Sequence, residues 1–163
     1  MVRQSIGLLI AILCPLSANA SFVYPVGDRE HRPGTSENGF VITRDFDEDG
    51  HTAVDLSNSL EGGEIRAITD GTVVERCNAI DPTNAKECYG FGNVLVIEHL
   101  LQEGTFYSLY AHMRHQSLLV TIGDDVVAGQ KIGEVNCTGY MISKYGTSPC
   151  ESNGKAGSHT HFA

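Results

Sequence analysis

Apolar positions along this chain fall in short β-branched and aromatic runs, and the 3.6-residue spacing of an amphipathic helix is hard to find. Glycine, asparagine and aspartate interrupt these runs at short intervals, as they do between strands joined by turns. The pattern predicts strands at 39–44, 64–68, 71–76, 93–99, 105–112 and 131–135. Residues 69–71, "TDG", are predicted to form a tight hairpin turn, and 101–104 to join two further strands. The expected fold is therefore all-β, with few or no helices.

The first twenty residues follow a different pattern. They contain one positive charge in "MVRQS", the apolar run "IGLLIAILCPL" and the small residues "ANA". The apolar run is too short to span a bilayer, and "ANA" is typical of a signal cleavage site. Leu13 is too bulky for a lipoprotein cleavage that would use Cys14. We therefore predict a signal peptide at 1–20, export to the periplasm or the medium, and no stable membrane anchor after cleavage.

The rest of the chain has a suitable length for one domain with its own core, and it shows no repeat or linker. We expect an irregular lead-in segment at 21–37 and a single domain at 38–163 that is a monomer. The sequence ends at Ala163, two residues after "HTH", where a strand would ordinarily continue. Either the domain closes abruptly there or the chain is a truncated piece of a longer protein.

The formal net charge is −9, and no basic run occurs anywhere in the chain. An acidic protein is not attracted to nucleic acid or to anionic lipid by its net field. Nucleic-acid binding is therefore not expected.

Four cysteines remain after the signal peptide: Cys77, Cys88, Cys137 and Cys150. Four cysteines allow three pairings, and the sequence leaves these open. Pairing within Cys77–Cys88 and within Cys137–Cys150 is favoured because each pair brackets a polar, turn-rich loop. A four-thiolate zinc site is the competing interpretation, but the chain has no CxxC spacing. Disulfides agree with an exported protein.

The stretch "DFDEDGHTAVDLSN" at 45–58 raises the question of a metal. Asp45, Asp47 and Asp49 alternate before a glycine, as in a calcium loop. An EF-hand loop that began at Asp45 would need a bidentate carboxylate at its twelfth position, which is Leu56 here. A solvated acidic turn is the simpler interpretation of these three aspartates.

Zinc requires ligands that converge from separate parts of the chain. His51 and Asp55 stand four residues apart, and "HTH" places His159 and His161 at alternate positions. Alternate residues of a strand project from one face, so both imidazoles are expected to point to the same side. His112 ends the apolar run 105–112. These groups together favour a zinc site over a set of unrelated surface histidines.

The motifs "HTAVD", "YAHM" and "GSHTHF" resemble, in order and approximate spacing, those of the lysostaphin-type (LytM-like) zinc endopeptidases of bacterial cell walls. That family shows HxGxD, YAHL and a "GPHLHFE"-like ending. The connecting stretches "GGEIRAITDGTVV", "GFGNVLVIEH" and "VTIGDDVVAGQKIGEV" are also similar to the family's. The resemblance covers 50–162 and implies antiparallel sheets that form an open groove. Ala53 and Thr160 depart from the family's glycine and leucine.

Carried over by position, the resemblance implies that His51, Asp55 and His161 hold one zinc ion per chain. Three protein ligands leave a fourth position for water, which is typical of catalytic zinc. His112 and His159 would flank that position, one as a proton acceptor and one as an oxyanion stabiliser. Which histidine has which role stays open.

The function implied is an exported zinc metalloendopeptidase that hydrolyses peptide bonds in peptidoglycan cross-links or stem peptides. Peptidoglycan peptides are then its partners. The alternative, from a different class, is a non-catalytic LytM-like module that binds the cell wall or activates another wall hydrolase. A calcium-binding adhesion module is a third interpretation. His31, His99 and His115 match no catalytic position and are expected to be structural or at the surface.

Overall fold

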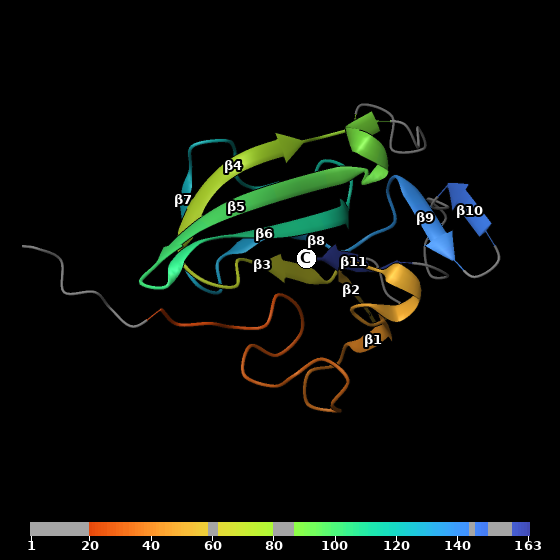
Figure 1. The fold of residues 1–163 in the computed structure, drawn as a ribbon, viewed down its shortest axis with the longest axis horizontal. Helices are drawn as coiled ribbons and strands as arrows, with labels where there is room; N and C mark the ends of the chain where they lie inside the picture. Colours follow the sequence, from red (N-terminus) through yellow and green to blue (C-terminus); the bar gives the residue numbers. More distant parts are fainter. Residues whose placement is uncertain (1–19, 59–61, 80–86, 144–145, 150–157) are drawn as a thin grey trace, which may run out of the picture.

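The structure, a computed structural model, describes residues 20–58, 62–79, 87–143, 146–149 and 158–163 (Figure 1). The signal peptide predicted at 1–20 lies almost entirely outside the described residues. Within them, no helix has the length and apolar character needed to cross a membrane.

Antiparallel β-structure dominates the described residues. One sheet has seven strands in the order β1-β2-β11-β6-β5-β4-β7, and two further sheets pair β3 with β8 and β9 with β10. The strands of the large sheet are β1 (Val41–Arg44), β2 (Val54–Ser57), β4 (Gly71–Cys77), β5 (Asn93–Leu101), β6 (Gly104–Met113), β7 (Asp125–Val126) and β11 (Thr160–Phe162). The other four are β3 (Glu64–Arg66), β8 (Lys131–Glu134), β9 (Tyr140–Ser143) and β10 (Gly146–Pro149). Two short 3₁₀ turns, η1 (Glu48–Gly50) and η2 (Glu87–Gly90), complete the described elements. The all-β prediction is confirmed.

The main core lies between one face of the seven-stranded sheet and the β3–β8 pair. Ile65 of β3 and Ile132 of β8 are fully buried in the same apolar cluster as Ile97 of β5 and Tyr110 of β6. Residues from the lead-in segment, such as Val26, also join this cluster. Burial of these side chains supplies the main favourable free energy of folding, because apolar surface leaves water.

The predicted hairpin turn at 69–71 is wrong. β3 does not pair with β4; it pairs with β8, whereas β4 pairs with β5 and β7. The chain after β3 bonds to 128–130 instead of turning back: the Ala67 N–H donates to the Gln130 carbonyl, and the Asp70 carboxylate accepts the Ala128 N–H. Residues 69–71 therefore connect a strand of the β3–β8 sheet to a strand of the seven-stranded sheet. The junction predicted at 101–104 is correct, since β5 and β6 form a long hairpin there.

The other face of the large sheet carries the polar cluster discussed below. Figure 1 shows β11, which ends the chain, in the middle of the sheet between β2 and β6. Phe162 of β11 packs on the core side against Tyr110, with ring centroids 5.4 Å apart. Thr160 is fully buried and donates to the Ala111 carbonyl. His159 and His161, at the alternate positions, therefore project from the opposite face.

Candidate metal centre

Strand register brings three polar residues into one row across the sheet. In the β1–β2 and β2–β11 ladders, Asp55 pairs with Arg44 on one side and with His161 on the other. His161 in turn pairs with Ala111 of β6. Residues directly opposite in antiparallel strands point to the same face, so the side chains of this row share one surface.

Three donor atoms from His51, Asp55 and His161 meet on that surface. His51 Nε2 lies 3.2 Å from His161 Nδ1, and Asp55 Oδ1 lies 3.3 Å from the former and 3.0 Å from the latter. In the described part of the chain, these three residues form a group that could hold a metal ion, because their potential ligand atoms all lie within 4.8 Å of one another. Strands β2 and β11 supply two of these donor atoms, and the turn before β2 supplies the third.

The triangle has the dimensions that a zinc ion requires. Tetrahedral zinc binds nitrogen and oxygen at about 2.0–2.2 Å, which places neighbouring ligand atoms about 3.3–3.6 Å apart. The three observed separations lie at or slightly below this range. Two imidazoles and one carboxylate also match the ligand set of catalytic zinc, which leaves one coordination position open.

His51 is oriented by the turn that precedes it. Its Nδ1 lies 3.3 Å from the backbone carbonyl of Asp45 and donates to it, so the Nε2 lone pair points to Asp55 and His161. This is the usual way in which a metal-binding imidazole is held in one tautomer. Asp45, Asp47 and Asp49 are themselves exposed, and no metal cluster of the described residues includes them. The acidic turn thus acts through a carbonyl rather than through its carboxylates.

Asp55 stays ionised despite its partial burial. Burial opposes the charged form, but a hydrogen bond with His161 and attraction to His159, His161 and His51 outweigh it, so the pKa of Asp55 is lowered. An ionised carboxylate next to imidazole nitrogens is the form that binds a cation.

His112 lies beside the triangle in a constrained position. Its φ is 56°, in the left-handed region, and its Nδ1 lies 2.7 Å from the Thr138 carbonyl, to which it donates. Burial, reinforced by repulsion from His159, lowers the pKa of His112 to about 3, so the ring is neutral. With Nδ1 protonated, Nε2 carries a lone pair that can accept a hydrogen bond from a water in the cleft.

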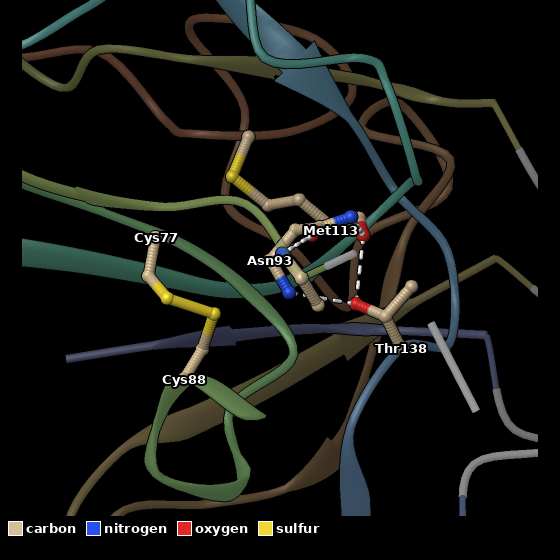
Figure 2. Close-up of a disulfide and its surroundings, with 6 residues drawn as sticks. Cys77, Cys88, Asn93, Met113 and Thr138 are labelled. Carbon is tan, nitrogen blue, oxygen red and sulfur yellow. Dashed lines mark hydrogen bonds between the residues drawn. A yellow bond between two sulfur atoms is a disulfide. The ribbon is translucent and has the colours of Figure 1, made fainter. Parts of the chain in front are cut away.

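A buried polar node fixes the Thr138 segment behind His112. Thr138 Oγ1 accepts the Asn93 N–H at 3.0 Å and donates to the Met113 carbonyl at 2.8 Å, while Asn93 Nδ2 donates to the same carbonyl (Figure 2). Asn93 is fully buried and Thr138 is 2% exposed. The left-handed backbone of His112 is therefore fixed by the bonds to the carbonyl of Met113, the next residue, and by the bond of its own ring to the Thr138 carbonyl.

His159 lies outside the triangle but close to it. Its Nε2 is 3.9 Å from Asp55 Oδ1, and its ring centroid is 4.8 Å from that of His112. Its backbone N–H donates to the Asn136 carbonyl. The two imidazoles of His112 and His159 thus stand together on one side of the three donor atoms.

The cluster opens into a cleft of about 220 Å³. Five further residues line it that sequence reasoning did not single out for the site: Arg44, Tyr89, Gly90, Phe91 and Tyr140. Tyr140 belongs to the stretch that follows Cys137, and Tyr89 is 84% exposed. The only sequence signals were the position of Arg44 at the end of a predicted strand and the aromatic residues around "YGFG".

The other histidines lie elsewhere. His99 is buried, with Nδ1 2.9 Å from the Asp70 carbonyl and Nε2 2.7 Å from Ser108 Oγ, so both of its ring nitrogens have partners. His31 is exposed and bonds to Asp28. His115 is partly buried and belongs to no metal cluster of the described residues.

Cys77 and Cys88 form a disulfide that joins the end of β4 to η2 (Figure 2). It packs in a small cluster with Ala79, Val94 and Ala111, under the Phe91 side of the cleft. Cys150 lies outside the described residues, so its pairing with Cys137 stays a prediction.

The fold and this site together define a β-sheet protein with a His–Asp–His centre in an open cleft. Residues 49–163 match the sequence profile of Peptidase family M23, and the chain belongs to this family. The resemblance to lysostaphin-type enzymes found in the motifs is thereby confirmed.

Individual relatives include an activator and a peptidase. The murein hydrolase activator NlpD of Escherichia coli (strain K12) is 33% identical over 109 residues, 67% of this chain and 25% of that protein. The chain thus spans about a quarter of that relative's length. A zinc-containing peptidase from Vibrio cholerae is structurally similar, with a TM-score of 0.51, 26% identity and coverage of 87% of this chain and 36% of that one. A chain of the SpoIIQ–SpoIIIAH pore-forming complex shares the fold, with a TM-score of 0.53, 19% identity and coverage of 89% and 83%.

Proposed function

We propose that this protein is an exported, zinc-dependent endopeptidase that hydrolyses peptide bonds in peptidoglycan. The observation that carries the proposal is the triangle of His51, Asp55 and His161 atoms, with edges of 3.0–3.3 Å, at the base of an open cleft. Membership of Peptidase family M23 and the similarity to a zinc-containing peptidase support the same function.

In this proposal His51 Nε2, Asp55 Oδ1 and His161 Nδ1 hold the metal. Zinc bound there would supply Lewis-acid chemistry, polarising the scissile carbonyl and lowering the pKa of water toward about 7. Three protein ligands would leave one position for water or substrate.

The chain's own residues would move the proton. His112 has its Nδ1 proton committed to the Thr138 carbonyl, so its Nε2 can accept a proton from the attacking water and return it to the leaving amine. His159 stands next to both His112 and Asp55, where its imidazole can stabilise negative charge that develops on the carbonyl oxygen. Phe91 and Tyr140 line the cleft with aromatic surface that substrate can contact.

A digestion of purified sacculi tests the proposal. The zinc-loaded protein is incubated with sacculi, with and without a zinc chelator, and released fragments are identified by mass spectrometry. Chelator-sensitive release of fragments with newly hydrolysed peptide bonds is expected from the wild-type protein and not from His161→Ala. Absence of any hydrolysed peptide, with zinc bound at one per chain, would contradict it.

A second function has its own support. The relatives at 33% identity are named as murein hydrolase activators, so this chain could act on the wall by stimulating another enzyme. The same sacculi distinguish the two functions when a separate wall hydrolase is added. An activator would increase release by that hydrolase even after His51, Asp55 and His161 are replaced by alanine, whereas the proposed peptidase would lose its effect.

A further inference from the structure

Arg44 occupies a defined place next to the metal centre. It lines the same cleft as His51, Asp55 and His161, and it stands directly opposite Asp55 in the β1–β2 ladder. Adjacent strands are about 4.8 Å apart, so the arginine is roughly one strand from Asp55 and two strands from His161. Its side chain starts on the surface that carries the metal centre.

A break in the strand register places Arg44 on this surface. Ile42 pairs with Leu56, but the next pair is Arg44 with Asp55, so Thr43 is the extra residue of a bulge. Continued regular pairing would set Arg44 opposite Val54, which packs on the core side of β2. A bulge that re-aims one side chain toward a site is a structural feature found beside active sites.

The guanidinium has no carboxylate partner among the described residues. Its Nη2 donates a hydrogen bond of 3.3 Å to the Glu48 carbonyl. The Glu48 carboxylate accepts the Asp45 N–H, and the Asp45 carboxylate accepts the Phe46 N–H. Ion pairs of the described residues do not include Arg44, although it ends β1 next to a turn with four acidic residues. The other N–H donors of the guanidinium thus remain available to a ligand in the cleft.

The chemistry of the group indicates the ligand. A guanidinium presents paired N–H donors that match the two oxygens of a carboxylate, and such pairs fix orientation as well as add affinity. The other side chains along the cleft are histidines and aromatic residues, apart from Asp55. A positive charge beside a metal-binding carboxylate does not favour cation binding, so metal affinity gives no reason for an arginine at this position.

We propose that Arg44 binds a free carboxylate of the substrate and makes the enzyme selective for peptides that carry one next to the scissile bond. One residue of extended chain spans about 3.3–3.6 Å, so a carboxylate on Arg44 lies one to two residues from a carbonyl at the metal centre. This inference rests on the proposed peptidase function and adds the class of peptide that the site accepts.

The test uses a set of three peptides that share one scissile bond. One has a single free carboxylate at the C-terminus, one has it on the side chain next to the scissile bond, and the third has both positions amidated. Binding is measured by calorimetry on the zinc-loaded protein, and kcat/KM by mass spectrometry, for wild type, Arg44→Gln and Arg32→Gln. Arg32 is an exposed arginine outside the cleft, so its variant makes the same charge change elsewhere.

We expect wild type to bind and cleave a free-acid peptide more efficiently than the amide, and Arg44→Gln to reduce that preference by roughly 10- to 100-fold. Arg32→Gln should keep the preference for the free acid. Whichever of the two acid peptides is cleaved more efficiently shows whether Arg44 binds a C-terminal or a side-chain carboxylate. Equal binding of acid and amide by wild type, or an unchanged preference in Arg44→Gln, would overturn the inference. An increase in zinc affinity in Arg44→Gln with no change in peptide preference would also overturn it.

The two proposals fail in different ways. Preferential binding of the free acid without any cleavage would contradict the peptidase function and leave the carboxylate contact in place. Cleavage of all three peptides at equal rates would leave the peptidase function in place and remove the role of Arg44.

Discussion

Two polar clusters that contain histidine lie on the same seven-stranded sheet, and they differ in what the histidine nitrogen atoms face. His99 of β5 is buried, and its two ring nitrogens contact the Asp70 carbonyl and Ser108 Oγ. The Ser108 hydroxyl continues to Tyr110, whose oxygen accepts the Ile68 N–H. Every polar atom of this chain of bonds has a partner within the protein.

The second cluster is built in the opposite way. Nitrogen atoms of His51 and His161 approach the same carboxylate oxygen of Asp55, and all three residues line a cleft. Such convergence concentrates lone pairs at one point, an arrangement that a cation stabilises. Histidine is buried in both clusters, so burial alone does not indicate function. The informative difference is whether the ring nitrogens face protein partners or a shared point in the cleft.

The largest expected effect is at Asp55. Replacing it with alanine removes the one anionic ligand, so we expect zinc content to fall to background and peptide cleavage to fall below about 1% of wild type. The fold should persist because the side chain faces the cleft. Zinc is measured by elemental mass spectrometry and folding by circular dichroism. Asp45→Ala is the matched control, since Asp45 contacts His51 only through its backbone carbonyl; equal zinc loss in both variants would contradict the assignment.

His112→Asn separates catalysis from metal binding. Asparagine tolerates the left-handed backbone at this position, where φ is 56°, and it lacks an imidazole lone pair. We expect one zinc per chain to remain while kcat falls by about 10²- to 10⁴-fold, as for loss of a general base. Steady-state kinetics on a defined peptide provides the measurement. Wild-type turnover in this variant would rule out His112 as the proton acceptor.

His99→Leu should affect stability without affecting the metal centre. The substitution leaves the Asp70 carbonyl and the Ser108 hydroxyl without their imidazole partner, which costs about 2–4 kcal/mol of unfolding free energy. Urea denaturation followed by circular dichroism measures the loss. Zinc content and kcat of the folded protein should match wild type, and a specific loss of zinc would remove the distinction between the two clusters.

The disulfide between Cys77 and Cys88 is expected to have the smallest effect. The bond closes a loop with a sequence separation of 11, so the double variant Cys77→Ser, Cys88→Ser should lose about 2–3 kcal/mol of unfolding free energy. Phe91 lines the cleft, packs against the disulfide cluster and accepts the His112 N–H through its carbonyl. Loss of the disulfide should therefore loosen this side of the cleft and raise KM several-fold. Thermal unfolding and kinetics measure the two changes; an unchanged melting temperature would show that the bond does not constrain the unfolded chain.

The sequence predicted the strands of the large sheet better than their partners. Runs of β-branched and aromatic residues bounded by turn residues located β5 and β6 to within a few residues, because each strand is long. The pairing of β3 with β8 was missed because a local turn signal at 69–71 gives no information about partners that lie 65 to 70 residues further along the chain. The short strands β2 and β7 were missed because they owe their extended form to neighbours on the sheet.

The candidate site divides in the same way. His51, Asp55, His112, His159 and His161 could be selected from short motifs, and the fold brings them together. Arg44 could not be placed, because its direction depends on a bulge in β1 that no local pattern announces. The Thr138 carbonyl that holds His112 is a backbone atom, and residue types carry no signal for such a contact.

Anomalous X-ray diffraction at the zinc absorption edge tests the central claim most directly. Crystals of the zinc-loaded protein should show one peak, with His51, Asp55 and His161 as the protein ligands at about 2.0–2.2 Å and an open fourth position. No zinc at these three residues in a fully folded protein, or zinc bound by cysteine sulfur instead, would contradict the account.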